Sequence, residues 1–142
     1  PWQHVLEPLG GYLWLAASLA TRHHGHFPGQ SLASAFNFGP NLTSNRTVGQ
    51  LVNELLWHTG GEWIDASDAM AVHEASKLNL ATDKAYHLLD WQPVWDFEET
   101  IARTAEWYLR EPNVTDVQEL TLGQIHAYQQ AASAKGLPWS RC

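Results

Sequence analysis

Most of this chain consists of segments whose apolar residues recur at helical spacing, and each segment is followed by glycine or proline. This pattern is the strongest constraint on the fold. The clearest segment opens at Thr47 and Gln50, which are spaced as a capping box, and it ends at Gly60-Gly61. Between these signals, apolar residues recur on one helical face: Val48, Leu51, Val52, Leu55 and Leu56. The spacing therefore predicts a helix that buries one side.

Four more stretches predict helices by the same reasoning. They are residues 6–20, residues 83–89, a helix from residue 97 to near Glu111-Pro112 after a cap pair at Asp96 and Glu99, and a last helix that opens at Thr121 with Gln124 and stops at Gly136. The residues expected to point inward are Leu6, Leu9, Leu13, Ala16, Ala17 and Ala20; Ala85, Leu88 and Leu89; Phe97, Ile101, Ala105, Tyr108 and Leu109; and Leu122, Ile125, Tyr128 or Gln129, and Ala132.

Three short apolar stretches favour strands. Residues 35–38 alternate and end at Gly39-Pro40, and residues 62–65 and 78–80 are briefer candidates. Helices separated by short strands predict an α/β fold, in which a small sheet is covered by helices. The strands are few, which we expect of a chain that has lost an N-terminal portion.

Size and charge narrow the classes of protein that need considering. A chain of 142 residues is long enough for one domain. Its net charge of −7, with no basic cluster, argues against nucleic acid as a partner, and no apolar run is long enough for a membrane span. Cys142 is the one cysteine, which excludes an internal disulfide framework and favours a reducing compartment such as the cytoplasm.

The sequence lacks the motifs that would supply catalysis or hold a cofactor. No glycine-rich dinucleotide turn, phosphate loop, nucleophile elbow or Tyr-x-x-x-Lys pair is present, so we assign no catalytic and no cofactor-binding residue. Gly10-Gly11 and Gly60-Gly61 are interpreted as packing and capping glycines. His23, His24 and His26 resemble a metal site, but a solvated loop after a helix end explains them better, and we predict no metal.

Eight tryptophans are many for this length. Trp57, Trp91 and Trp107 lie beside apolar helix positions and are expected in the core. Other tryptophans stay open to a ligand role because they lie at the edges of elements: Trp2, Trp63 and Trp95.

Several runs resemble the CDP-glucose 4,6-dehydratase family of the extended short-chain dehydrogenase/reductase superfamily, and together they cover essentially the whole chain. Those more particular to this family are residues 1–8 (PWQHVLEP), residues 73–75 (HEA), and the tail with Gln124-Ile125, Tyr128 and residues 136–139. Features shared more widely across nucleotide-sugar epimerases and dehydratases include residues 37–39 (NFG) and 91–93 (WQP). The resemblance also continues through residues 104–108 (TAEWY).

The resemblance implies a two-part protein. An N-terminal Rossmann domain would hold NAD and the catalytic residues, and residues 1–142 would be the C-terminal nucleotide-sugar-binding region. The implied reaction is that of an NAD-dependent lyase, which converts CDP-glucose to CDP-4-dehydro-6-deoxyglucose by hydride transfer and loss of water. The isolated 142-residue chain is expected to be inactive and weakly stable, whereas the full-length protein is expected to form a homodimer.

The same resemblance implies where this chain would contact its substrate. Asn45 falls where relatives contact the nucleotide, and His73 and Glu74 match a His-acidic pair, for which we expect contacts to phosphate and to ribose hydroxyls respectively. Gln3 and His4 follow directly after the position where relatives carry a substrate-binding arginine. Each of these residues has a plainer interpretation as a polar loop or helix-edge residue.

Two alternatives stay open from the sequence. The chain could derive from another nucleotide-sugar dehydratase or epimerase of the same superfamily. It could also be a stand-alone, non-catalytic binding domain, which predicts a stable isolated fold.

Overall fold

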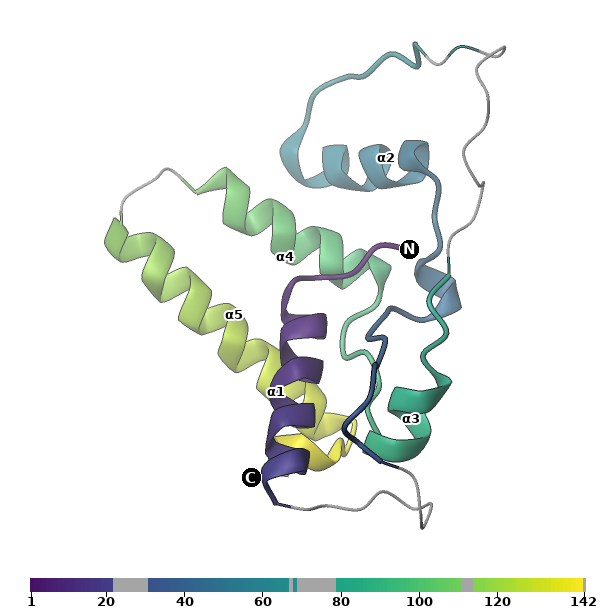
Figure 1. The fold of residues 1–142 in the computed structure, drawn as a ribbon. Helices are drawn as coiled ribbons and strands as arrows, with labels where there is room; N and C mark the ends of the chain where they lie inside the picture. The colour runs from purple at the N-terminus through teal and green to yellow at the C-terminus, as the bar shows by residue number, and fades with distance from the viewer. Residues whose placement is uncertain (22–30, 67, 69–78, 111–113, 142) are drawn as a thin grey trace.

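The structure is a computed structural model that describes residues 1–21, 31–66, 68, 79–110 and 114–141. Seven helical elements follow one another in these ranges: α1 (Leu6–Ala20), η1 (Leu42–Ser44), α2 (Val48–Thr59), α3 (Asp83–Leu89), α4 (Phe97–Leu109), α5 (Val114–Ala134) and η2 (Pro138–Arg141). Helices α4 and α5 form a hairpin that opens toward the N-terminal end of α1, and α2 lies across α4 (Figure 1). No helix in these ranges combines the length and apolar character that a membrane crossing needs.

Two of the three helix starts predicted from capping residues, those of α2 and α4, are confirmed. The Thr47 hydroxyl accepts a hydrogen bond from the Gln50 N–H at 3.2 Å, and the Gln50 side chain accepts from the Thr47 N–H at 2.9 Å. Asp96 caps α4 by accepting from the Glu99 N–H at 2.9 Å. Helix α2 ends at Gly60, whose φ of 68° lies in the left-handed region that glycine adopts without strain.

The predicted start of the last helix was wrong. Helix α5 begins at Val114, one and a half to two turns before Thr121. The Thr121 hydroxyl donates to the Val117 carbonyl at 2.7 Å, and the Gln124 side chain donates to the Arg103 carbonyl at 2.8 Å. The Thr121 side chain therefore makes a hydrogen bond within α5, and the Gln124 side chain makes one from α5 to α4. The Thr-x-x-Gln spacing does not form a helix cap here.

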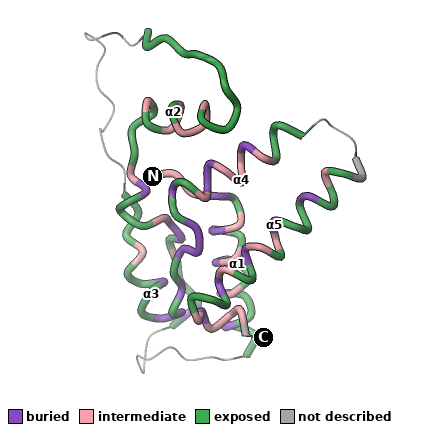
Figure 2. The backbone as a smooth tube through the Cα atoms, turned by 180° about the vertical axis from the view of Figure 1, so that it is seen from behind, coloured by how far each residue is buried: buried purple, intermediate pink, exposed green. Residues whose placement is uncertain are grey.

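The buried face predicted for α1 was also wrong. The residues that α1 buries are Glu7, Gly11 and Ser18, whereas Leu9 and Leu13 of the apolar stripe are 45% and 73% exposed. Spacings of four and seven residues place the three buried positions on one side and the leucines on the other. Figure 2 shows how much of α1 is exposed. Other residues expected inward are exposed as well, namely Val48, Tyr108, Leu109 and Leu122. Helix α2, which was predicted to bury one side, contains no fully buried residue.

The three predicted strands are not formed within the described residues. Backbone hydrogen bonds join none of residues 35–38, 62–65 or 79–80 to another segment there, and Leu78 lies outside the described ranges. The helical part of the predicted α/β fold is confirmed, while its sheet is missing from this part of the chain. A strand needs a partner with its own free N–H and C=O groups, and the described segments supply none beside residues 35–38.

The core consists of two clusters that meet along residues 91–95. The first contains Trp91, Leu88, Leu89 and Phe38, and Trp14 of α1 packs against it. The second joins residues from the 94–95 turn, α5 and the tail: Val94, Trp95, Tyr128, Ala132 and Leu137. Trp91 is thus a core residue as predicted, but Trp57 and Trp107 are not, since they are 85% and 40% exposed.

Candidate functional site

The N-terminal segment lies against the turn that carries Asn45. The Trp2 N–H donates to the Ser44 carbonyl at 3.3 Å, and the Trp2 indole N–H donates to the Arg46 carbonyl at 2.9 Å. These two bonds hold residues 1–3 beside residues 44–46, which are 41 or more positions away in the sequence. The fold thereby brings Gln3 and Asn45, two of the predicted substrate-binding residues, onto neighbouring segments.

Asn45 ends the short helix η1 and leads into the cap of α2. Its side-chain amide donates to the Asn79 side-chain oxygen at 2.9 Å, and both groups are near the surface. Asn79 stands a few positions after His73 and Glu74, which lie outside the described residues. The Asn45 amide is therefore a hydrogen-bonding group near the surface, on the turn before α2.

Arg46 is a cation that the sequence reasoning missed. Its guanidinium lies 5.7 Å from the centroid of the Phe97 ring and 3.7 Å from a Glu98 oxygen. Both side chains of this ion pair are more than a third exposed, so water screens the pair and leaves the guanidinium able to bind an anion. In the sequence, Arg46 follows Asn45 directly.

Gln3 and His4 point in different directions. The Gln3 side-chain N–H donates to the Phe38 carbonyl at 3.2 Å, while its oxygen is buried without a partner among the described residues. His4 is 6% exposed, packs edge to face on Trp95 at 4.8 Å, and accepts through Nδ1 from the Leu6 N–H at 3.3 Å. The Gln3 side chain thus makes a hydrogen bond to the 35–38 segment, and the His4 side chain is buried in the interior.

Burial, together with the positive charge of Arg103, lowers the pKa of His4 to about 4. The ring is therefore neutral at physiological pH, and because Nδ1 accepts a hydrogen bond, the proton sits on Nε2. A neutral imidazole cannot neutralise a phosphate, but its Nε2–H can donate to an uncharged oxygen. His4 also borders a cavity of about 430 Å³ between the N-terminal segment and the α4–α5 hairpin.

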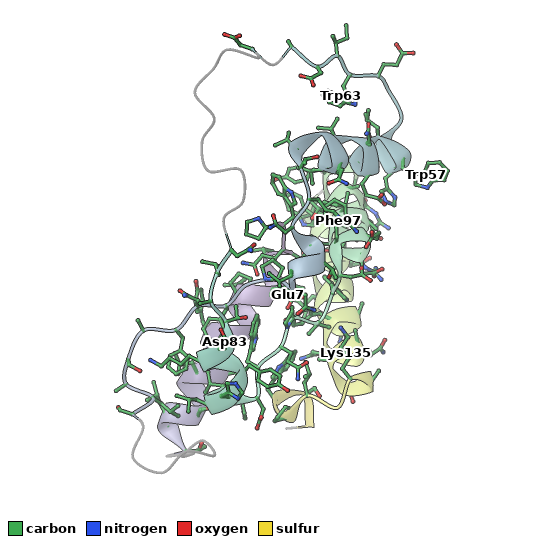
Figure 3. All side chains as sticks on the ribbon, turned by 90° about the vertical axis from the view of Figure 1, so that its right-hand side faces the viewer. Glu7, Trp57, Trp63, Asp83, Phe97 and Lys135 are labelled. Carbon is green, nitrogen blue, oxygen red and sulfur yellow. The ribbon has the colours of Figure 1, made fainter. Side chains whose placement is uncertain are left out.

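Beneath this region, Glu7 ties three elements together. Glu7 is labelled in Figure 3, and its carboxylate is fully buried. The carboxylate accepts hydrogen bonds from the Trp95 N–H at 2.7 Å, the Val94 N–H at 3.0 Å and the Tyr128 hydroxyl at 2.9 Å. Burial raises the pKa of Glu7, although the three hydrogen bonds and the charge of Lys135 oppose that shift. Burial and the neighbouring Glu7 also raise the pKa of Tyr128 above its usual range. The carboxylate fixes the start of α1, and with it the residues just before it.

The features that would receive a dinucleotide are absent from the sequence and from the part of the chain that the structure describes. The sequence has no glycine-rich turn to receive a pyrophosphate, and the described part has no strand that could lead into one. The arrangement can supply a cation at Arg46 and an amide at Asn45. The described ranges contain no cluster of potential metal ligands, and His23, His24 and His26 lie outside them.

No family model matches this chain. It is 36% identical over 135 residues to the CDP-glucose 4,6-dehydratase of Salmonella typhimurium, and the match covers 94% of this chain but 36% of that protein. The resemblance indicated by the sequence is therefore confirmed. The chain spans little more than a third of the length of the relative that it matches.

Proposed function

We propose that this chain is the nucleotide-sugar-binding part of a nucleotide-sugar dehydratase whose substrate is CDP-glucose. The observation that carries the proposal is the 36% identity to a CDP-glucose 4,6-dehydratase, which extends over nearly the whole chain. The position of Arg46 beside Asn45 supports it, because a diphosphate ligand needs cationic and amide donors together.

In this proposal, Asn45 and Arg46 bind the diphosphate end of the nucleotide from the turn before α2. His73 contacts phosphate as well, and Glu74 accepts hydrogen bonds from the ribose hydroxyls. Gln3 fixes the position of residues 35–38 through its hydrogen bond to the Phe38 carbonyl. The neutral His4 donates a hydrogen bond from its Nε2–H to an uncharged oxygen of the ligand. NAD, which oxidises and then reduces the sugar in the reaction implied by the resemblance, binds to a part of the protein that this chain does not supply.

Titration calorimetry with CDP-glucose tests the binding role directly. We expect CDP-glucose to bind, and Asn45→Ala to weaken it about tenfold, the effect of losing one hydrogen bond to a charged group. Asn53→Ala is the matched control, because Asn53 is an exposed asparagine on α2 whose side-chain oxygen accepts from Trp63. Equal binding by both variants would remove Asn45 from the site, and no heat with CDP-glucose would refute the proposal.

The same titration with UDP-glucose and dTDP-glucose separates the alternatives. Tighter binding of CDP-glucose than of the other two supports the proposal that the ligand carries a cytidine nucleotide. Tighter binding of either other nucleotide sugar would assign the chain to a different dehydratase or epimerase of the superfamily. Dehydration of CDP-glucose by a longer protein that contains this chain tests the reaction itself.

A further inference from the structure

Trp2 makes two hydrogen bonds to the turn that carries Asn45, one from its backbone and one from its indole ring. The backbone N–H donates to the Ser44 carbonyl at 3.3 Å, and the indole N–H donates to the Arg46 carbonyl at 2.9 Å. The two acceptors belong to the residues on either side of Asn45. Trp2 therefore holds the backbone both before and after a proposed substrate-binding residue.

Asn45 lies at the centre of a tight turn. Its φ of −85° and ψ of 80° are close to those of an inverse γ-turn, and the Arg46 N–H donates to the Ser44 carbonyl at 3.1 Å, which is the bond that closes such a turn. One backbone hydrogen bond stabilises a turn only modestly. The direction in which the Asn45 side chain leaves the backbone therefore depends on the two added bonds from Trp2.

The side chains of Asn45 and Arg46 differ in what else supports them. The Arg46 guanidinium lies against Phe97 and Glu98, both on α4. The Asn45 amide donates to the side chain of Asn79, which is itself exposed. The position of the Asn45 amide is therefore set mainly by its own backbone, and it is the group that loss of the Trp2 bonds would displace.

We propose that Trp2 is a positioning residue, which fixes the backbone of Asn45 so that the Asn45 amide binds the diphosphate of a nucleotide sugar. The indole N–H makes this role specific to tryptophan, because every residue except proline carries a backbone N–H. The inference rests on the proposed function, since it concerns the binding role that the proposal gives to Asn45.

Titration calorimetry of Trp2→Phe with CDP-glucose tests this role. Phenylalanine keeps an aromatic ring and the backbone N–H but removes the indole donor. We expect CDP-glucose to bind about fivefold more weakly, the effect of losing one hydrogen bond. Trp63→Phe is the matched control, because the Trp63 indole N–H also makes a hydrogen bond of 2.9 Å, to the Asn53 side chain on α2. This control should bind CDP-glucose as the unsubstituted chain does.

A second titration separates positioning from a general loss of structure. Since Trp2 acts through Asn45, Trp2→Phe should change the affinity by less than about twofold in a chain that already carries Asn45→Ala. A general loss of structure would weaken binding by the same factor with and without Asn45→Ala, and that result would overturn the proposal. Equal affinities of Trp2→Phe and Trp63→Phe would overturn it as well.

Amide exchange keeps this outcome separate from that of the proposed function. Exchange of the Arg46 N–H, which closes the turn, should be at least about fivefold faster in Trp2→Phe and unchanged in Trp63→Phe. Absence of CDP-glucose binding by the unsubstituted chain would refute the proposed function, and with it the diphosphate as the ligand of Asn45. Faster exchange at Arg46 would then still show that Trp2 fixes the turn, whereas unchanged exchange would overturn the positioning role whether or not CDP-glucose binds.

Discussion

Glu7 is the residue on which the packing of three elements converges. Glu7→Ala would leave two buried N–H groups and the Tyr128 hydroxyl without their acceptor, so we expect the free energy of unfolding to fall by about 3 kcal/mol. Glu7→Gln keeps one acceptor oxygen and should cost less. Urea denaturation followed by circular dichroism measures both. Glu62→Ala, at an exposed position, is the control and should stay within about 0.5 kcal/mol.

His4 gives stability a pH dependence with a defined sign. Its folded pKa of about 4 lies below the ordinary histidine pKa of 6.5, so the unfolded state takes up the proton first. The stabilisation is complete above pH 6.5 and is lost as the pH falls toward 4, by about 3 kcal/mol in all. Glu7 has the opposite sign, since its raised pKa means that acid relieves the cost of its buried charge.

The comparison of the wild-type chain with His4→Phe isolates this histidine, because phenylalanine keeps a ring against Trp95 and does not titrate. Urea melts between pH 4 and pH 7 should show the difference in unfolding free energy between the two proteins changing with pH. A constant difference would mean that His4 titrates alike in the folded and unfolded states. An NMR titration of the imidazole gives the pKa directly.

At the scale of elements, two helical glycines should respond in opposite ways to the same substitution. Gly11→Ala forces a methyl group into the Phe38 ring and should destabilise the fold by about 2 kcal/mol, despite the better helix propensity of alanine. Gly123→Ala on α5 meets no atom within 4 Å and should stabilise by up to about 1 kcal/mol. Thermal melts of both variants check this, and equal shifts would contradict the packing of α1 on Phe38.

The same elements show what the sequence could and could not predict. Helices α2, α3 and α4 begin where predicted, because caps and helix-breaking residues act through neighbours in the chain. The inward face of α1 could not be predicted, since periodicity finds an apolar stripe without saying what covers it. Residues 35–38 have the alternation of a strand but no partner strand among the described residues, because local sequence encodes the alternation and not the partner. Of the proposed site, Asn45 stays a prediction from the sequence, and Arg46 was added to the proposal once the structure placed its guanidinium. The interior position of His4 appeared only once Trp95 and Arg103 were placed around it.

At the scale of the whole molecule, the two core clusters should unfold together. Helix α1 packs Trp14 against the first cluster and Leu6 against the second, and its Glu7 binds the turn between them. The Trp14 indole also donates to the Leu89 carbonyl at 2.7 Å, which ties the same helix to α3. If either cluster loses its packing, α1 loses contacts on that side. Because α1 also packs against the other cluster, we expect the two clusters to unfold together.

Native-state hydrogen exchange at rising urea concentration tests this coupling. The amides of Leu88 in the first cluster and Ala132 in the second should converge on one unfolding free energy. Leu88→Ala should lower both values equally, by about 3 kcal/mol, because it opens a cavity in the first cluster alone. Protection at Ala132 that outlasts protection at Leu88 would instead show two units that open independently, and α1 would then be a bridge between them that can break without unfolding the second cluster.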